Sequence, residues 1–261
     1  MQARRIGVIH ARGLWTFYSF GLFRALRFGL EALVGPVASG MLFLLVFSIA
    51  IGGTQDLRGG VTFLQYLAPG IAMFTLIHSA FEMAAFPVIY DKIEGIIQDP
   101  LMSPLAPWEV AAGYALTGAT VGLMTGGATL MLGWAFVPLP MHDPAVILGF
   151  AVAAALLFGM CGTIAGLWAE KWDQLSVVDS FLMLPLAFLS GAFFTVHSVP
   201  ELGRDLIAMN PVFYAIDGAR FGVLGVGDAP LAVGAAVMAA LDVAVAVLVW
   251  RLFAIGYKIK P

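Results

Sequence analysis

The stretch that decides the fold is AVILGFAVAAALLFGMCGTIAGLWA, residues 145–169, which runs for 25 positions without a charged side chain. An α-helix rises about 1.5 Å per residue, so about 20 such residues cross the roughly 30 Å hydrocarbon core of a bilayer. Lipid offers the backbone no hydrogen-bond partners, and a helix satisfies its own peptide groups. The stretch is therefore predicted to be a membrane-spanning helix.

Five further stretches share this character, which predicts an all-α, polytopic membrane protein with six spans. The 261 residues are 61% hydrophobic and 11% charged, with a mean hydropathy of +0.96, whereas soluble domains carry about 25% charged residues. We expect residues 1–29 to form a cytoplasmic N-terminus with an interfacial helix, and residues 30–261 to form the transmembrane domain. The predicted spans are Ala32–Gly52, Phe63–Phe86, Val110–Val137, Ala145–Ala169, Val178–Val196 and Ala229–Phe253.

Charge, cysteine content and the first residues of the chain limit the partners, cross-links and processing that we expect. The net charge of −3 indicates no nucleic-acid partner, and the single cysteine, Cys161, excludes a disulfide within the chain. Residues 1–10 lack an apolar core followed by a cleavage site, so no removable signal peptide is expected.

Lysine and arginine predict the orientation, because positively charged loops stay in the cytoplasm. With six spans both termini lie on one side, which carries ten basic residues against three on the other. We therefore expect a multi-pass protein of the bacterial inner membrane with both termini cytoplasmic. The ten are Arg4, Arg5, Arg12, Arg24, Arg27, Lys92, Lys171, Arg251, Lys258 and Lys260, and the three are Arg58, Arg204 and Arg220.

The segment Val8–Phe28, before the first predicted span, has the pattern of an amphipathic helix. At about 100° per residue, Arg12, Arg24 and Arg27 fall in one arc, and aromatic and leucine side chains fall opposite. Such a helix suits the headgroup layer and contact with membrane lipids. The alternative is a plain positively charged anchor for the first span.

Glycines repeat at steps of four in the third and fourth predicted spans. Gly118, Gly122 and Gly126 lie in the third span, and Gly162 and Gly166 lie in the fourth. Small residues at this spacing let helices approach closely in lipid, so they predict a tightly packed bundle and say nothing of cargo.

The predicted cytoplasmic loop between spans two and three, Pro87–Glu109, is rich in proline. A short helix is expected from Val88 to Gln98, stopped by Asp99-Pro100, and Ser103-Pro104 then leads toward the third span. A stiff loop of this kind could transmit a push from a partner. The alternative is a simple connector with turn residues.

The predicted outward loop between spans five and six contains two helix starts. Ser198-Val-Pro-Glu201 has the spacing of a capping box and predicts a helix Pro200–Met209. Asn210-Pro211 starts a second helix that runs to about Phe221. Two short helices with a sharp break are typical of a re-entrant hairpin in the outer leaflet, and lone periplasmic surface helices are the alternative.

Three ionisable residues fall inside predicted spans. His78 and Glu82 are four positions apart on one face of span two, and Asp242 lies near the middle of span six. Charge at the centre of a bilayer costs at least about 2.5 kcal/mol. These groups are candidates for a proton relay or a contact with polar cargo, or else for a polar contact between helices. No metal site is expected, because two ligands do not fill a coordination shell.

No phosphate-binding loop of the form G-x-x-x-x-G-K-[S/T] is present, since none of the four lysines follows a glycine. We therefore predict no ATP site, catalytic residue or cofactor in this chain. If ATP drives transport, a partner subunit must bind ATP and Mg²⁺ and hydrolyse the nucleotide.

Several short motifs, in their order against the six spans, resemble type-2 ABC exporter permeases, which handle drugs, polysaccharides and lipid-linked cargo. The resemblance covers the chain from about Arg12, and Asp99-Pro100 departs from it where relatives usually keep a hydrophobic continuation. The motifs are Glu94-Gly95 with Leu101-Met-Ser-Pro-Leu105, Ala169-Glu-Lys-Trp-Asp173, Leu189-Ser-Gly-Ala-Phe193, and Met209-Asn-Pro-Val-Phe-Tyr214 followed by Asp217-Gly-Ala-Arg220.

The resemblance implies a permease that pairs with a second copy, as a homodimer, or with a paralogue, and with two ATP-binding subunits. Its cargo would be a small amphipathic molecule, a lipid or a glycan. The segment Val8–Phe28 would be the connecting helix, Asp91–Ser103 the coupling element in the ATPase, and Pro200–Gly222 the outward cap. Spans one and five would form much of the contact between permeases.

Three groups of candidate site residues follow. Those for coupling are Asp91, Lys92, Glu94, Gly95, Asp99, Ser103 and Pro104; those of the connecting helix are Arg12, Arg24 and Arg27; those of the hairpin are Pro200, Glu201, Asn210, Pro211, Tyr214, Asp217 and Arg220.

Two other function classes are weighed against an exporter. An ion-driven secondary transporter could relay protons through Glu82 and Asp242, but such carriers usually show two related halves and broken helices, which we do not find. A lipid-modifying enzyme is faintly suggested by Asp217-Gly-Ala-Arg220. That chemistry needs several clustered carboxylates, which this segment lacks.

Overall fold

The computed structural model describes residues 10–27, 29–51, 56–57, 60–194 and 200–258, which are almost entirely helical. Several residues that the predictions above include lie outside these ranges, namely Arg4, Arg5, Val8, Phe28, Gly52, Arg58, Val196, Ser198 and Lys260. The elements are α1 (Ala11–Arg27), α2 (Gly29–Ile51), β1 (Asp56–Leu57), β2 (Val61–Thr62), α3 (Phe63–Ile93), α4 (Gln98–Met102), α5 (Pro107–Phe136), α6 (Pro144–Trp168), α7 (Trp172–Val178), the π-helix η1 (Asp179–Met183), α8 (Leu184–Phe188), α9 (Glu201–Ala208), α10 (Pro211–Leu224) and α11 (Leu231–Ile255).

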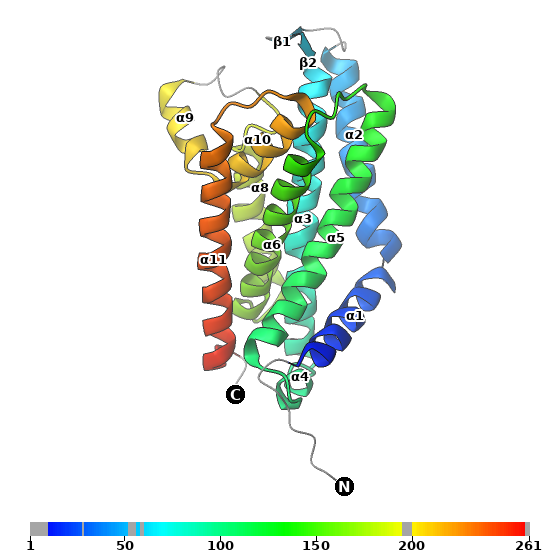
Figure 1. The fold of residues 1–261 in the computed structure, drawn as a ribbon. Coiled ribbons are helices and arrows are strands. Elements are labelled where there is room, and N and C mark those ends of the chain that lie inside the picture. Colours follow the sequence, from blue (N-terminus) through cyan, green and yellow to red (C-terminus); the bar gives the residue numbers. More distant parts are fainter. Residues whose placement is uncertain (1–9, 28, 52–55, 58–59, 195–199, 259–261) are drawn as a thin grey trace.

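The long helices run side by side along one axis (Figure 1). Helix α1 begins and α11 ends at the same end of this bundle, which also carries α4; we call it the α4 end. The opposite end, which we call the α9 end, carries α9, α10 and the two strands. The strands are antiparallel, with Asp56 opposite Thr62, and were not predicted.

Five helices in the described residues are long and apolar enough to cross a membrane: α2, α3, α5, α6 and α11. They overlap predicted spans one, two, three, four and six, with bounds that differ by a few residues. The prediction of a polytopic helical membrane protein is therefore confirmed.

The fifth predicted span does not form one long helix. The helical stretch begins earlier, at α7, passes through the π-turn η1 and ends with α8 at Phe188. Pro185 cannot donate the backbone hydrogen bond that an α-helix needs at that position, and the widened π-turn lies just before it. Gly191, with φ of +72°, then takes the left-handed conformation that follows the helix.

The prediction of a separate helix from Val88 to Gln98 is wrong. Helix α3 continues without a break to Ile93, and the chain reverses at Gly95, whose φ is +72°. Asp99-Pro100 does not stop a helix, because α4 contains it. Pro100 is the third residue of α4. The N–H groups in the first turn of a helix have no partner within the helix, so a proline there removes no hydrogen bond.

Glycines bring α3, α5 and α6 into close contact at the centre of the bundle. A methyl group added at Gly122 of α5 would lie 2.6 Å from the carbonyl oxygen of Leu76 and 2.7 Å from Cβ of Ala80 in α3. A methyl group added at Gly166 of α6 would lie 2.5 Å from the carbonyl oxygen of Ala85. The predicted role of the glycine repeats in helix packing is confirmed.

Candidate functional site

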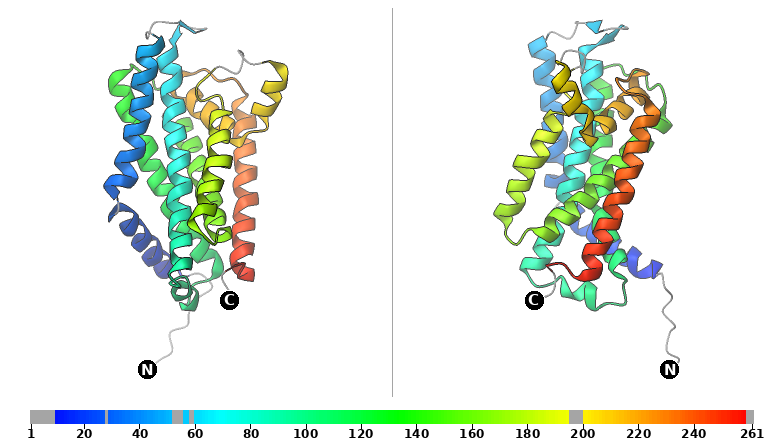
Figure 2. Two further views of the ribbon diagram at one scale, coloured as in Figure 1. Left: turned by 180° about the vertical axis from the view of Figure 1, so that it is seen from behind. Right: turned by 90° about the vertical axis from the view of Figure 1, so that its left-hand side faces the viewer.

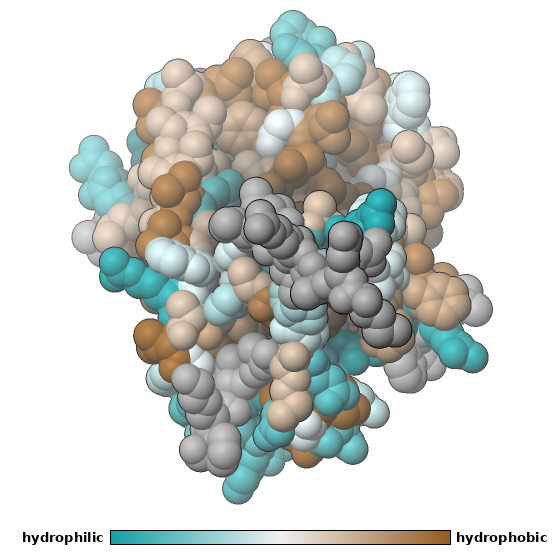
Figure 3. Space-filling model, turned by 60° about the horizontal axis from the view of Figure 1, so that its bottom comes forward, coloured by the Kyte–Doolittle hydropathy of each residue, from teal (hydrophilic) through white to brown (hydrophobic). Residues whose placement is uncertain are grey.

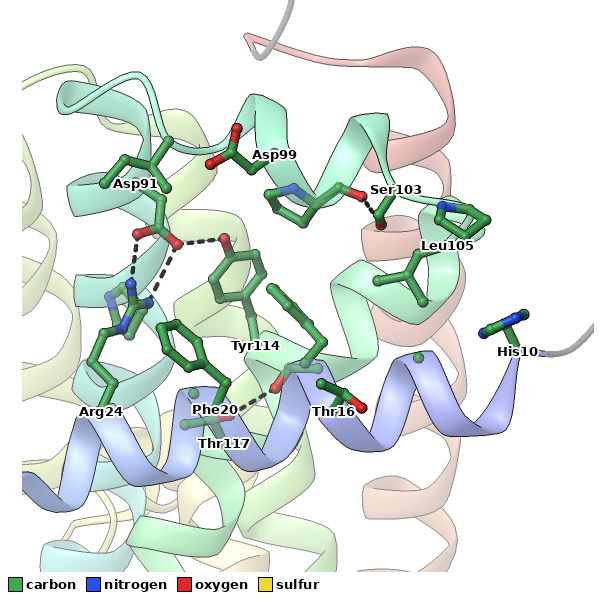
Figure 4. A pocket seen from close by; sticks show the side chains of 18 of the residues that line it. His10, Thr16, Phe20, Arg24, Asp91, Asp99, Ser103, Leu105, Tyr114 and Thr117 are labelled. Atoms are coloured by element: carbon green, nitrogen blue, oxygen red, sulfur yellow. Dashed lines mark hydrogen bonds and ion pairs between the residues drawn. The ribbon is translucent and has the colours of Figure 1, made fainter.

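Three helices meet at Asp91, near the α4 end. The guanidinium of Arg24 in α1 donates two hydrogen bonds to the Asp91 carboxylate, Nη1 to Oδ1 at 2.7 Å and Nη2 to Oδ2 at 3.3 Å. The Tyr114 hydroxyl of α5 donates to Oδ2 at 2.6 Å. Figure 4 shows the three side chains converging. The paired bonds from one guanidinium fix geometry as well as charge, so α1 is held against α3 and α5.

Close packing supports this polar cluster. The ring of Phe17 in α1 meets the Tyr114 ring edge to face at a centroid distance of 5.0 Å. One helical turn along α1, a methyl group added at Gly21 would lie 2.8 Å from Oγ1 of Thr117. Helix α1 therefore lies directly on α5, with its basic residue Arg24 turned inward. The sequence pattern placed Arg24 with Arg12 and Arg27, and only the latter two are exposed.

A second buried carboxylate, not predicted from the sequence, ties the start of α1 to the start of α5. Glu109 is 1% exposed and accepts hydrogen bonds from the backbone N–H groups of His10 at 2.6 Å and Ala106 at 2.8 Å. A carboxylate at the third position of a helix is favoured by the helix dipole and commonly caps the preceding turn. Pro107 at the first helical position followed by Glu109 at the third was the signal available in the sequence.

Two lysines cap the end of α6. Lys92 donates to the carbonyl oxygens of Leu167 and Ala169, the latter at 2.7 Å. Lys258 donates to the carbonyl oxygen of Trp168 at 3.0 Å and pairs with Glu170 at 2.7 Å. Cations are favoured at the C-terminus of a helix. The hydrogen bond and charge of Lys258 lower the pKa of the exposed Glu170 carboxyl.

The turn between α3 and α4 presents an apolar surface at the tip of the α4 end. Ile93, Ile96 and Met102 are 46%, 41% and 83% exposed, and Glu94 and Asp99 are exposed beside them. We call these five residues the α4 tip. Figure 3, which brings this end forward, shows hydrophilic and hydrophobic residues intermingled on it.

The predicted coupling residues thus divide into two sets. Glu94, Gly95, Asp99 and Pro104 are exposed, whereas Asp91 and Lys92 make contacts within the bundle. The Ser103 hydroxyl donates to the carbonyl oxygen of Pro100. A cavity of about 660 Å³ separates α1 from the α3–α5 connection, and its wall includes side chains labelled in Figure 4.

The predicted hairpin residues at the α9 end form two short helices with a capped junction. The Asn210 side chain accepts from the N–H of Val212 at 3.0 Å, as an N-cap, and donates to the carbonyl oxygen of Leu186 at 2.6 Å. Pro211 is the first residue of α10. The Tyr214 hydroxyl donates to the carbonyl oxygen of Ala208 at 2.9 Å. Pro200 and Glu201 are exposed at the start of α9.

Arg220 and Asp217 anchor α10 to the bundle. Arg220 is fully buried, its guanidinium lies 3.6 Å from the centre of the Tyr66 ring, and Nη2 donates to the carbonyl oxygen of Gly191 at 3.0 Å. Asp217 accepts from the N–H groups of Asp228 and Ala229 at 2.8 and 2.9 Å. Both side chains fix backbone positions at the α9 end, where cation–π contact offsets the cost of burying Arg220.

The two residues predicted to share a face of span two do meet, and a third joins them. His78 Nδ1 lies 3.4 Å from Oε2 of Glu82, and His78 Nε2 lies 3.1 Å from Oδ1 of Asp179 in η1. Asp179 was not predicted, because it stands 101 positions away on another helix. Asp242 lies apart on α11, and its buried Oδ1 has no hydrogen-bond partner in the described residues.

Comparison with known proteins identifies the family. The family model described as "ABC-2 type transporter" matches residues 15–224. The chain belongs to the ABC-2 type transporter family.

A relative that matches nearly the whole of this ABC-2 type chain is a transport permease. The chain is 29% identical over 247 residues to the inner membrane transport permease YadH of Escherichia coli K12, covering 95% of this chain and 96% of the relative. It is 26% identical over 207 residues to nodulation protein J of Rhizobium leguminosarum bv. viciae, with 75% and 76% covered. The ABC-2 type chain is therefore a transmembrane permease subunit of an ATP-binding-cassette exporter, and its family implies an ATP-binding partner subunit.

Proposed function

We propose that this permease is driven by two ATP-binding subunits that dock on the α4 tip, in the cytoplasm of a bacterium. Both termini would then be cytoplasmic, in agreement with the excess of basic residues on that side. ATP and Mg²⁺ would be bound by the partner, since the chain has no phosphate-binding loop. The residues 91–104 would pass the motion of the partner to the bundle.

The observation that carries this proposal is the position of the α4 tip beside the Arg24–Asp91–Tyr114 cluster. The tip exposes three large apolar side chains beside two carboxylates, and apolar side chains grouped in this way are typical of a surface that binds a partner. Only two residues before it, Asp91 is bonded to two other helices. A push on the tip would therefore move α1, α3 and α5 together.

Helix α1 would lie in the cytoplasmic headgroup layer as the connecting helix. Trp15, Phe20 and Phe23 are 67%, 63% and 65% exposed, although α1 also packs on α5. Exposed aromatic side chains next to Arg12 and Arg27 suit the interface between lipid and water. The same helix carries Arg24, so membrane contact and coupling would meet on one element.

Two copies of the permease would pair through α2 and the α7–α8 segment. Both carry exposed apolar residues, among them Leu42 and Ile49 on α2 and Phe181 and Phe188 on the other segment. Helices α9 and α10 would form a hairpin that caps the outward end of the pathway between the copies. The α7–α8 segment, which overlaps predicted span five, would complete the set of six spans. The exported cargo would be small and amphipathic, a lipid or a glycan.

Docking at the α4 tip is tested with one pair of matched substitutions. Met102 and Met209 are equally exposed, at 83% and 82%, but lie at opposite ends of the bundle. We expect Met102→Asp to reduce co-purification of the ATP-binding subunit that is recovered with the wild-type chain at least about tenfold, because a charge replaces an apolar contact at the interface. We expect Met209→Asp to leave it unchanged.

Equal recovery of the ATPase with both variants would contradict docking at the α4 tip. Gly95→Ala provides a second variant, since it strains the turn without adding charge. An added methyl group would meet no other atom within 4 Å there, and the strain comes from the left-handed backbone. We expect it to weaken ATPase recovery less than Met102→Asp does.

A further inference from the structure

The cluster of His78, Glu82 and Asp179 carries an unbalanced negative charge within the bundle. The imidazole lies between the two carboxylates, and the three side chains are 25%, 28% and 24% exposed. Two carboxylates and one imidazole sum to −1 even when the imidazole is protonated. In the described part of the chain, no lysine or arginine pairs with either carboxylate. A partly buried anionic group of this kind is stabilised by a bound cation.

A cavity of about 550 Å³ lies against this cluster, between α1, α2, α3 and α7. Glu82 forms part of its wall, together with Phe86, Tyr90 and Trp172. The rings of Phe86 and Trp172 are 5.7 Å apart at 30°. A cation is attracted both to a carboxylate and to the faces of such rings.

Ser79 gives a second, independent indication of a ligand. Its side chain lines the same cavity and is 1% exposed. Its hydroxyl has no hydrogen-bond partner within the described residues. Buried polar groups are normally satisfied, so an unpaired hydroxyl beside Glu82 indicates that the cavity takes a molecule with polar as well as apolar parts. Among the described residues of the cavity wall, the other charged one, Arg24, already pairs with Asp91.

The geometry favours an organic cation over a metal ion. One ligand atom from each of His78, Glu82 and Asp179 lies within 4.8 Å of the others, so a metal ion is the competing occupant of the cluster. A metal ion would engage these three side chains alone and would give the aromatic wall of the cavity no role. An amphipathic cation, with a charged centre and an apolar body, matches the carboxylate and the aromatic wall together.

The site also lies on the face of the bundle where a pathway between two permease copies would run. Seen from behind, α3 lies between α2 and the α7–α8 segment (Figure 2, left). Asp179 is the first residue of the π-helix η1, and π-turns within helices often mark functional sites.

We propose that Glu82, positioned by His78 and Asp179, is the anionic contact of a binding site for amphipathic organic cations in this aromatic cavity. The inference rests on the proposed export function, since it names the chemical class of a cargo. Its test uses the full chain without an ATPase, so failure of ATPase docking and failure of cation binding are distinguishable.

The probe is tetraphenylphosphonium, compared with tetraphenylborate, an anion of nearly the same shape. Equilibrium dialysis measures each against the full chain in lipid nanodiscs, with empty nanodiscs subtracted. We expect saturable binding of the cation at least about tenfold tighter than of the anion. We expect Glu82→Gln to weaken cation binding about tenfold, because a charged contact is lost. Glu170→Gln, the same change at an exposed carboxylate, should leave binding unchanged.

Equal affinity for the two probes, or unchanged affinity in Glu82→Gln, would overturn the proposal. A protein that fails to bind the phosphonium but binds one Zn²⁺ ion, and loses that ion in Glu82→Gln, would also overturn it. If Glu82→Gln does not fold, two other variants decide the matter. We expect Glu82→Asp to keep the preference for the cation, and Trp172→Leu to weaken binding of the cation about fivefold. Loss of preference in the first or unchanged affinity in the second would contradict the site.

Discussion

Asp91 links three helices, α1, α3 and α5, near the α4 end of the bundle. Its carboxylate is almost fully buried and accepts three hydrogen bonds from two other helices. Burying an ion pair gives little net stability, because both charges lose water, whereas leaving one partner unpaired is costly. The contact therefore serves mainly to fix α1 against α3, so that a movement of one helix is transmitted to the other.

At this scale we expect Arg24→Gln to destabilise the protein by about 3 kcal/mol, since it leaves a buried carboxylate without its cation. Tyr114→Phe removes one hydrogen bond and should cost about 1–2 kcal/mol. Thermal unfolding of the purified protein in detergent measures both.

The double variant Arg24→Gln with Asp91→Asn is the control for this assignment. It removes both charges, so it should be more stable than Arg24→Gln alone. If the double variant instead loses the sum of the two single effects, the ion pair is not the cause.

Among the elements, α5 depends on glycine for its contact with α3. Gly122 leaves no room for a methyl group beside the α3 backbone, whereas nothing lies within 4 Å of a methyl group added at Gly127 of the same helix. Close helix approach replaces the hydrophobic effect as the source of association in lipid.

We expect Gly122→Ala to lower stability by about 1–3 kcal/mol through overpacking. Gly127→Ala should be neutral or stabilising by up to about 1 kcal/mol, because alanine is the better helix former. The apparent melting temperatures of the two variants, measured side by side, check this. A Gly122→Ala protein as stable as Gly127→Ala would show that the close approach is not needed.

The helices could be predicted from the sequence where the signal is local. Apolar length determines a span, so α2, α3, α5, α6 and α11 lie where expected. The break at η1 and the continuation of α3 past Pro87 depend on how a proline and a glycine are accommodated in the packed bundle, which no local pattern shows. The cap signal at Asn210-Pro211 held, whereas Pro200, predicted inside the first turn of the preceding helix, is the N-cap of α9 and Ser198 lies outside the described residues.

The candidate site divides in the same way. The pair His78 and Glu82 is four residues apart on one helix and was predictable. The partners Arg24 and Tyr114 stand 67 and 23 positions from Asp91 on other helices, and Asp179 stands 101 positions from His78. Such contacts follow from tertiary packing, so one sequence could not reveal them.

For the whole molecule, the arrangement places the α4 tip and the α9–α10 pair at opposite ends of the membrane-spanning helices (Figure 1). In a Cys161→Ala background, we expect Met209→Cys to react with a membrane-impermeant maleimide in right-side-out vesicles, and Met102→Cys to react only in inverted ones. Labelling of both positions from one side would contradict the proposed orientation.

ATP hydrolysis tests the central claim most directly. It is measured in liposomes that hold this chain, the ATP-binding subunit that co-purifies with it, or both. With the chain alone, we expect no ATP hydrolysis above the level of empty liposomes. We expect the rate of ATP hydrolysis by the partner to change when the wild-type chain is added, but not when the Met102→Asp variant is added. Hydrolysis of ATP by the chain alone would contradict the account. So would a rate of ATP hydrolysis by the partner that does not change when the wild-type chain is added.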